Sequence, residues 1–511
     1  MAKILIYGTG FQGRQESLQI EQAMEEYINN NDVYFLHCDN SMRFCIDNPE
    51  GNTARCRVCM WMQSINRRHT LDKRIKVISI KDNITTKIMD QAAQIFSYNN
   101  GKELMEIEYH GVEIGMGAMS TYISLTRNLA PKINIKTKPY FDLLLKEQIL
   151  LTLVLEKLNY KHNFDKIIFH NGRFAQYKPL LNFAESNGIE FICTESNISK
   201  YGKVIKNNFY NTIPHEMTSI AAKIMGCWAK STLTLQEKES IGKDFFERKR
   251  EAKATGDKVY TENQKRGYII ESWNPEKENI IIFNSSEDEF TAIGKSFNKR
   301  KLFESQLSGI KTILNRYGND ETKHFYLRIH PNLKDVDYKF HKNLYKLTYP
   351  NLTVIAASSS VDTYTLIDRA SKIIVFGSTV GIEGSYARKP VICLGPASYN
   401  ELDVVYIPKN INELWDFIDN KNLGTKYNIN VLKFGFYQMA MFDFLVPDKC
   451  KYINNDVYRK HFFHKSISCY KYEKLWGSNF LFILFRSFLF RITNMIKYLC
   501  CNTVKVPQLE E

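Results

Sequence analysis

The sequence predicts an α/β protein built from two Rossmann-like halves. Apolar, strand-like runs alternate with helix-like segments along most of its 511 residues, and this alternation is typical of parallel sheets covered by helices. It stops at a charged, glycine-containing stretch, residues 245–267, and then starts again. A chain of this length accommodates two or three domains. We therefore expect two parallel sheets that face a cleft, where ligands lie at the carboxyl ends of strands.

The first half contains five strand-like runs. A helix follows the first run, residues 141–158 have the three- and four-residue apolar spacing of a long helix, and residues 177–188 predict a helix closed by Gly188. The strand-like segments, some with the polar loop that follows them, cover residues 3–7, 33–38, 74–80, 165–173 and 189–197.

The second half repeats the pattern after the stretch 245–267, which we interpret as a linker; a solvated helix is the alternative for its first part. Its strand-bearing segments cover residues 279–290, 324–332, 352–360, 372–390 and 391–395. We expect one domain over residues 1–255, a second over 256–430, and a helical C-terminal extension over 431–511.

The net charge of +14, from 69 Lys and Arg against 55 Asp and Glu, favours an anionic partner. Nucleic acid ranks last, because the sequence has no Lys- and Arg-rich block and no RNA-binding signature. The N-terminus shows no export signal, so we expect a cytoplasmic protein. In that compartment most of the eleven cysteines are expected to be thiols or metal ligands.

The clearest chemical motif is "FGSTVGIEG" in the second half. Gly377 and Gly381 permit a tight turn from a buried strand into a helix, and the hydroxyls of Ser378 and Thr379 complete a phosphate-binding arrangement. Glu383 lies in the first helical turn, where a carboxylate can accept hydrogen bonds from ribose hydroxyls. A plain helix cap, with Glu383 against the helix dipole, explains the same residues equally well.

Two further polar segments follow strands of the same predicted sheet. In "LRIHPN", Arg328 and His330 alternate on one strand face that Pro331 ends, and both side chains suit an anion. In "NSSEDEF", Ser285 and Ser286 stand directly after a strand. A histidine packed against a neighbour is the ordinary alternative, but three polar loops at one sheet edge favour a single ligand cleft.

The first strand runs into "GTGFQG", with Gly8, Gly10 and Gly13 at the spacing of a dinucleotide fingerprint. Asp39, at the end of the second strand, keeps a nicotinamide-dependent oxidoreductase open as a minority interpretation. The small residues of this loop equally allow a sugar or phosphate to approach the backbone.

Four blocks of the sequence resemble bacterial capsule and surface-polysaccharide biosynthesis proteins. The blocks are residues 171–197, 283–290, 327–332 and 362–402, and the similarity spans about residues 1–430. These proteins are glycosyltransferases of GT-B fold. The resemblance implies a nucleotide-activated sugar, linked to CMP, CDP or UDP, in the second half and a glycan acceptor facing the first half.

The resemblance also implies roles for individual residues. His330 and Pro331 match the His-Pro motif that holds the nucleotide phosphate in capsule Kdo and polysialic acid transferases. Ser378 and Thr379 match the hydroxyl pair of that site, and Glu383 matches its ribose-binding acid.

On the acceptor side, Asn171, Gly172 and Arg173 match an N-G-R element of the family. Glu195 stands where the family often has an acid followed by Arg-Gly, but Ser196 and Asn197 follow it here. The paired acids at eight-residue spacing of many retaining transferases are absent, because valines occupy both positions eight residues from Glu383.

Sugar transfer requires a base that accepts the proton of the acceptor hydroxyl. Glu195, at a strand end, is the candidate, with His215 as its rival; an ordinary ion pair is the alternative for Glu195. We expect transfer without a required metal or other cofactor.

Cys38, Cys45, Cys56 and Cys59 lie within 22 residues and include one C-x2-C pair. The sequence leaves three alternatives open: a structural zinc site, an iron–sulfur centre, or free thiols.

Residues 478–499 come closest to a membrane segment, but Arg486, Arg491 and Lys497 interrupt them. Their basic amphipathic pattern predicts a helix in a membrane interface, or one docked on the first domain. With the resemblance, this indicates a peripheral protein on the inner face of the plasma membrane that acts on a glycan or lipid-linked glycan.

The combined prediction is a glycosyltransferase of surface-polysaccharide synthesis. Three alternatives remain: a nucleotide-sugar 2-epimerase of the same fold, an NAD-dependent oxidoreductase, and a non-catalytic scaffold of capsule assembly.

Overall fold

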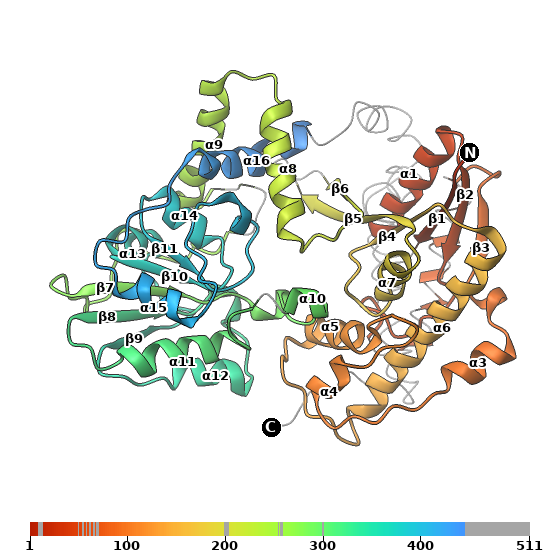
Figure 1. Ribbon diagram of the computed structural model, residues 1–511, viewed down its shortest axis with the longest axis horizontal. Coiled ribbons are helices and arrows are strands. Elements are labelled where there is room, and N and C mark those ends of the chain that lie inside the picture. Colours follow the sequence, from red (N-terminus) through yellow and green to blue (C-terminus); the bar gives the residue numbers. More distant parts are fainter. Residues whose placement is uncertain are drawn as a thin grey trace, which may run out of the picture.

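The computed structural model describes residues 1–8, 14–49, 51–53, 56–57, 59–60, 63–64, 67, 71–198, 204–253, 255, 259–298 and 301–444. In these residues the chain forms two α/β lobes, each around its own sheet (Figure 1). The prediction of two Rossmann-like domains in a GT-B-like arrangement is confirmed.

The first domain has a six-stranded sheet in the order β3-β2-β1-β4-β5-β6. Neighbouring strands are parallel except for β6, which pairs antiparallel with β5 and was not expected from the sequence. The central strands are short runs of Ile, Leu, Phe and Tyr that are buried on both faces, as parallel strands are. The strands are β1 (Lys3–Gly8), β2 (Asp32–His37), β3 (Lys76–Ser79), β4 (Lys166–His170), β5 (Glu190–Ile198) and β6 (Val204–Tyr210).

The helices of the first domain cover the sheet, and the long helix α6 is buried along most of its length. Pro139 stands at its first turn, where a missing N–H costs no hydrogen bond. The helices are α1 (Arg14–Ile28), α3 (Thr86–Ala92), α4 (Gly101–Met105), α5 (Ile114–Thr126), α6 (Lys138–His162) and α7 (Lys178–Ser186), with the short 3-10 turn η1 (Lys81–Asn83).

The second domain has a five-stranded parallel sheet in the order β11-β10-β7-β8-β9, with one apolar core on each face. Its strands are β7 (Glu278–Phe283), β8 (Lys323–Arg328), β9 (Leu352–Ile355), β10 (Lys372–Val375) and β11 (Val391–Cys393). Its helices are α10 (Lys295–Asn298), α11 (Gln306–Tyr317), α12 (Lys339–Tyr345), α13 (Thr363–Arg369), α14 (Val380–Tyr386) and α15 (Ile411–Asp419), with the turns η2 (Glu287–Glu289), η3 (Pro331–Leu333) and η4 (Asn400–Leu402).

Three helices pack on the second domain although two of them precede residue 255. These are α8 (Met217–Lys230), α9 (Leu235–Arg250) and α16 (Ile429–Phe444); α16 lies against both others. The expected linker 245–267 therefore begins inside α9, where Phe245 and Phe246 are buried in the second core. Packing places the change of domain between β6 and α8, earlier than the expected boundary, and makes residues 431–440 part of that core.

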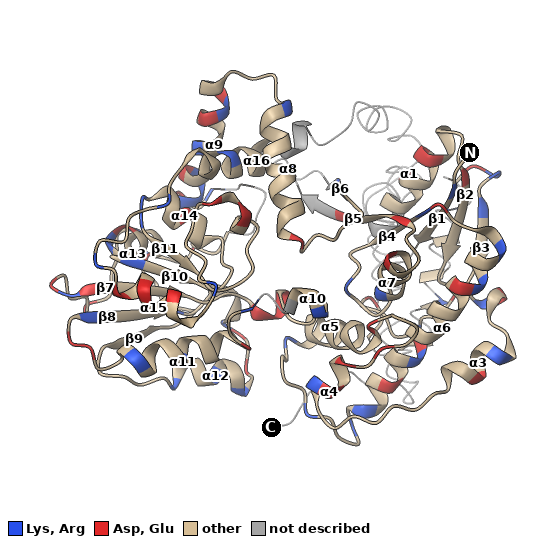
Figure 2. Cartoon of the chain, in the orientation of Figure 1, with Lys and Arg blue, Asp and Glu red and all other residues tan. Residues whose placement is uncertain are grey.

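No helix in the described part of the chain has the length and hydropathy needed to span a membrane. The predicted interfacial helix, residues 478–499, lies outside the described residues, as does the rest of the C-terminal extension beyond residue 444. Figure 2 shows that acidic and basic residues are mixed along the outer helices of both domains.

Candidate functional site

Each sheet has a topological switch point, where the connections from neighbouring strands run in opposite directions. In the second sheet β7 lies between β10 and β8, so connections leave it in opposite directions and open a crevice at the carboxyl ends of β7 and β10. In the first sheet the same argument selects the ends of β1 and β4. The loops singled out in the sequence follow β1, β4, β7 and β10, and the loop with His330 follows β8, the other neighbour of β7.

The three polar loops of the second domain meet at one edge and are bonded to one another. The Ser285 hydroxyl donates to the Phe376 carbonyl at 2.7 Å and accepts from the Gln306 amide at 2.8 Å. The backbone N–H of His330 donates to Asn284 Oδ1 at 2.8 Å. Ser286 Oγ accepts from Asn332 at 3.0 Å. Ser285 and Ser286 are buried and thus hold the loops in place.

The glycine loop after β10 requires its glycines for steric reasons. Gly377 has a φ of 86°, and an added Cβ would overlap the carbonyl oxygen of Pro396. A Cβ on Gly381 would overlap the Tyr399 hydroxyl, which donates to the carbonyl of Ser378. Ser378 is buried and Thr379 is exposed, so Thr379 presents its hydroxyl at the loop surface.

His330 is half-buried at the end of β8. Its Nδ1 accepts the backbone N–H of Asn332 at 3.1 Å, so the proton of the neutral ring lies on Nε2. The ring packs edge-on against Tyr260, with centroids 4.9 Å apart. Pro331 begins the turn η3 directly after it. The ring is thereby held in one tautomer as a donor.

Glu383 is fixed by an aromatic neighbour. Its Oε2 accepts the Tyr364 hydroxyl at 2.7 Å, and only 6% of the residue is exposed. Burial raises the pKa of Tyr364, and the negative charge of Glu383 raises it further. The phenol therefore stays protonated and acts as the donor. Glu383 thus lies beneath the edge instead of projecting from it.

The expectation that Arg328 would emerge beside His330 is wrong. Arg328 is 2% exposed, and its guanidinium donates to the carbonyls of Ala356 and Ser359 in the loop after β9. Burial lowers its pKa to about 10. The side chain therefore anchors that loop, and its position does not offer a fork to a ligand.

At the first domain's switch point, a turn with two left-handed residues follows β4. Asn171 has φ 60° and Gly172 φ 80°. The Asn171 amide donates to Glu195 Oε1 at 2.5 Å, and His170 Nε2 lies 3.9 Å from Glu195 Oε2. Asn171, directly after β4, thus orients the carboxylate of Glu195, which is partly exposed on β5.

His215 is a weak base in this position. Burial, then the nearby Arg173 and Lys178, lowers its pKa to about 3, so the ring is neutral and binds a proton poorly. Its ring packs edge-on against Phe297 of α10. Of the two candidate bases, Glu195 fits the role better.

The dinucleotide interpretation of the first loop loses its main support. Asp39 accepts from Ser41 Oγ at 2.5 Å, from the Lys81 backbone N–H at 2.7 Å, and from Ser79, so it serves the loop structure. A Cβ on Gly8 would overlap the Phe35 ring, which accounts for that glycine without a ligand. Gly10 and Gly13 lie outside the described residues.

Three cations of the first domain donate to main-chain carbonyls of the second. Arg127 donates to Asn332 at 2.8 Å, Arg173 to Glu289 at 2.7 Å, and Lys178 to Ile293 at 2.7 Å. Arg127 also pairs with Asp288. Arg173, placed on the acceptor side by the resemblance, is therefore part of the domain junction. No motif marked Arg127 or Lys178 in the sequence.

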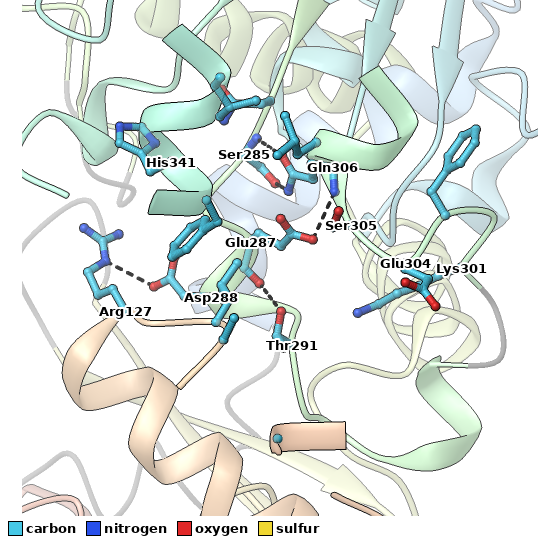
Figure 3. Close-up of a pocket in the computed structure, with 18 of the residues that line it drawn as sticks. Arg127, Ser285, Glu287, Asp288, Thr291, Lys301, Glu304, Ser305, Gln306 and His341 are labelled. Carbon is cyan, nitrogen blue, oxygen red and sulfur yellow. Dashed lines mark hydrogen bonds and ion pairs between the residues drawn. The ribbon is translucent and has the colours of Figure 1, made fainter. Parts of the chain in front are cut away.

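A cavity of about 810 Å³ lies at this junction, next to the carboxyl end of β7. Figure 3 shows Arg127, Asp288 and Glu287 on one side of it and Lys301 with Glu304 on another. Its walls come from both domains, and opposite charges are matched across them. The cavity borders the loop that carries Ser285 from the side of α11 and α12.

The four N-terminal cysteines gather in one region beside β1 and β2. They are thiols that form no disulfide. Within the residues described, no group of three or more His, Cys, Asp or Glu side chains is arranged to hold a metal ion. The metal site stays a prediction.

Residues 250–406 match the family model described as capsule polysaccharide biosynthesis protein, so the resemblance is confirmed for this part of the chain. No curated protein sequence matches the chain.

Several solved structures are similar at low identity. KpsC of Thermosulfurimonas dismutans, a beta Kdo 2,7 transferase, is 14% identical over 55% of this chain and 79% of its own, with a TM-score of 0.32. S. aureus MnaA, solved with UDP, is 12% identical over 89% and 98%, with a TM-score of 0.29. UDP-GlcNAc 2-epimerase of Methanocaldococcus jannaschii is 12% identical over 87% and 99%, with a TM-score of 0.26.

Proposed function

We propose that the protein is a glycosyltransferase that moves a sugar from a nucleotide sugar to a growing surface polysaccharide. The observation that carries the proposal is the bonded set of polar loops at the ends of β8, β7 and β10, at the switch point of the second domain. The match of residues 250–406 to the capsule polysaccharide biosynthesis family supports it.

On the donor side, the glycine loop after β10 would receive the phosphate. Thr379 offers an exposed hydroxyl there, and His330 offers Nε2–H from the other side of β7. Adjacent strands lie roughly 5 Å apart, so loops two strands apart are separated by about 10 Å. Donors fixed in this way stabilise the negative charge that the leaving nucleotide acquires.

On the acceptor side, Glu195 would accept the proton of the attacking hydroxyl. Asn171 holds one of its oxygens at 2.5 Å, and His170 lies near the other. The left-handed turn at Asn171 and Gly172 sets this geometry, and backbone strain of this kind concentrates at functional sites.

Binding of the donor is tested by thermal shift of the full chain with CMP, CDP, UDP and GDP, because a ligand of the folded state raises its apparent stability. We expect one of them to stabilise the protein. His330→Ala should weaken that binding by about 1.5–3 kcal/mol, the value of a hydrogen bond to a charged group. His324→Ala is the matched control, because His324 lies on the same strand and bonds to Thr353 instead. Equal loss in both variants, or no stabilisation by any nucleotide, would reject the site.

The need for a glycan acceptor distinguishes the transferase from the alternative, a nucleotide-sugar 2-epimerase. A transferase releases nucleotide from its donor only when a glycan acceptor is added, whereas an epimerase converts the sugar without one. Conversion of a nucleotide sugar in the absence of acceptor would favour the epimerase.

A further inference from the structure

Arg127 stands at the carboxyl end of α5 in the first domain. Residues 114–123 of this helix are buried, so the helix is fixed to the first core. The side chain of Arg127 crosses the domain junction, and Figure 3 shows it directed toward Asp288 of the second domain. A residue anchored in one domain thus acts on loops of the other.

The guanidinium of Arg127 binds two different loops of the second domain. In the loop after β7, Nε donates to Asp288 Oδ2 at 3.2 Å and Nη2 donates to Ser286 Oγ at 3.3 Å. In the loop after β8, Nη1 donates to the carbonyl of Asn332 at 2.8 Å. Because a guanidinium is planar and presents its N–H groups in a rigid fork, these three bonds fix the two loops relative to each other.

Asn332 connects this guanidinium to His330. Its backbone N–H donates to His330 Nδ1 at 3.1 Å, which leaves the ring proton on Nε2. Its side-chain amide donates to Ser286 Oγ at 3.0 Å, the same oxygen that Arg127 contacts. The main chain and the side chain of Asn332 are thus both held, and with them the hydrogen bond that sets the tautomer of His330.

The backbone of Arg127 is left-handed, with a φ of 62°. Helices commonly end on a residue in this conformation, and that residue is usually glycine, because a Cβ is unfavourable there. Arginine therefore gives the helix no advantage at this position. The interactions of its side chain across the junction offset the unfavourable backbone angle, and strain of this kind concentrates at functional sites.

Other cationic side chains that cross the junction have different targets. Arg173 and Lys178 donate to main-chain carbonyls in the chain between β7 and α11. Lys102 pairs with Glu304 of the same segment at 3.0 Å, and both of these side chains are exposed. These contacts fasten that segment to the first domain, whereas Arg127 also contacts the loop after β8.

We propose that Arg127 is a positioning residue for the nucleotide. By holding Asn332 it keeps His330 as a donor through Nε2–H, so the phosphate site of the second domain is complete only while the first domain is docked. If docking strengthens nucleotide binding, the nucleotide strengthens docking by the same factor. The inference rests on the proposed function, because that function assigns the His330 loop to the nucleotide.

The test is calorimetric titration of the full chain with CMP, CDP, UDP and GDP. We expect Arg127→Gly to weaken binding of the nucleotide that the natural protein prefers by about tenfold, a typical coupling between groups in one hydrogen-bond network. Glycine suits the left-handed backbone, so the variant removes the side chain without adding strain. Equal affinity in the natural protein and Arg127→Gly would overturn this inference alone. A natural protein that binds none of the four nucleotides would reject the proposed function, and the inference with it.

Two variants serve as matched controls. Arg388→Gly also replaces a left-handed arginine, with a φ of 61°, whose guanidinium lies over the Tyr427 ring. Lys102→Met removes another ion pair across the junction. Both variants should bind the nucleotide as the natural protein does. A loss in Lys102→Met equal to that in Arg127→Gly would show that any weakening of the junction suffices, which contradicts a specific role for Arg127.

A double variant separates positioning from general structural support. If Arg127 acts through His330, Arg127→Gly combined with His330→Ala should bind no more weakly than His330→Ala alone. Independent roles would instead multiply the two losses, and that result would contradict the inference. Arg127→Lys keeps the charge but not the planar fork, so we expect it to bind as weakly as Arg127→Gly. Full affinity in Arg127→Lys would refute the role assigned to the fork.

Discussion

Replacing Gly377 by alanine tests whether the loop after β10 is a nucleotide site shaped by steric need. Gly377 has a φ of 86°, which an L-residue adopts only at a cost of about 1–2 kcal/mol. The added Cβ would also overlap the Pro396 carbonyl oxygen, a backbone atom that cannot move aside as a flexible side chain does. Overpacking adds typically about 1–3 kcal/mol.

Gly188→Ala is the matched control. Gly188 also has a left-handed φ, 62°, but nothing lies within 4 Å of its added Cβ. Gly188→Ala therefore loses stability only through its unfavourable backbone angle, without a steric overlap. We expect Gly377→Ala to be less stable than Gly188→Ala by about 2 kcal/mol.

The assay is denaturant unfolding of both variants, followed by thermal shift with the nucleotide that stabilises the natural protein. Gly188→Ala should retain the full shift, and Gly377→Ala should lose most of it, because the loop must open to admit the Cβ. Equal stabilities, or an unchanged nucleotide shift in Gly377→Ala, would refute the steric reasoning and the placement of the phosphate.

Three further outcomes are expected. Glu195→Gln should lower sugar transfer by about 10²–10⁴-fold, the usual contribution of a general base, while the nucleotide thermal shift stays unchanged. Tyr364→Phe should lower the free energy of unfolding by about 1–3 kcal/mol, because the buried carboxylate of Glu383 loses its 2.7 Å donor, and denaturant unfolding measures this. Burial raises the pKa of Glu147 to about 8 from the usual 4.5, so the folded state keeps a proton that the unfolded state releases between these values. The free energy of unfolding should therefore fall as pH rises from 4.5 to about 8, and Glu147→Gln should flatten that slope in urea titrations.

The sequence predicted the second domain's site loops well because they depend on local patterns. A strand, a polar turn and a helix follow one another at 372–390 within nineteen residues, and glycine is required at Gly377 by its own backbone angle. Parallel neighbours bring the ends of β8, β7 and β10 to one edge whenever the alternation is correct. The direction of a single side chain does not follow from such patterns, and Arg328 turned into the core instead of the cleft.

The boundary between domains could not be derived from composition. The stretch 245–267 is rich in charged residues, and this composition is typical of a linker. Phe245 and Phe246 are nevertheless buried in the second core, where they pack against α16. That contact joins residues about 190 positions apart, which no local window contains. The sequence also could not predict the hydrogen bonds that Arg127, Arg173 and Lys178 donate to carbonyls of the second domain. Every residue has a main-chain carbonyl, so such an acceptor has no sequence signature.

Local spacing of apolar residues, glycines and hydroxyls thus determined the fold class and the edge of each sheet where chemistry is expected, since these depend on periodicity and backbone angles. Only the tertiary structure decided which polar side chains form hydrogen bonds that hold loops in place and which remain exposed at the surface. It also decided where one domain ends and the next begins. Those outcomes depend on contacts between segments that are remote in the sequence. A buried polar group needs a hydrogen-bond partner, so the segment that packs against it decides what the group does.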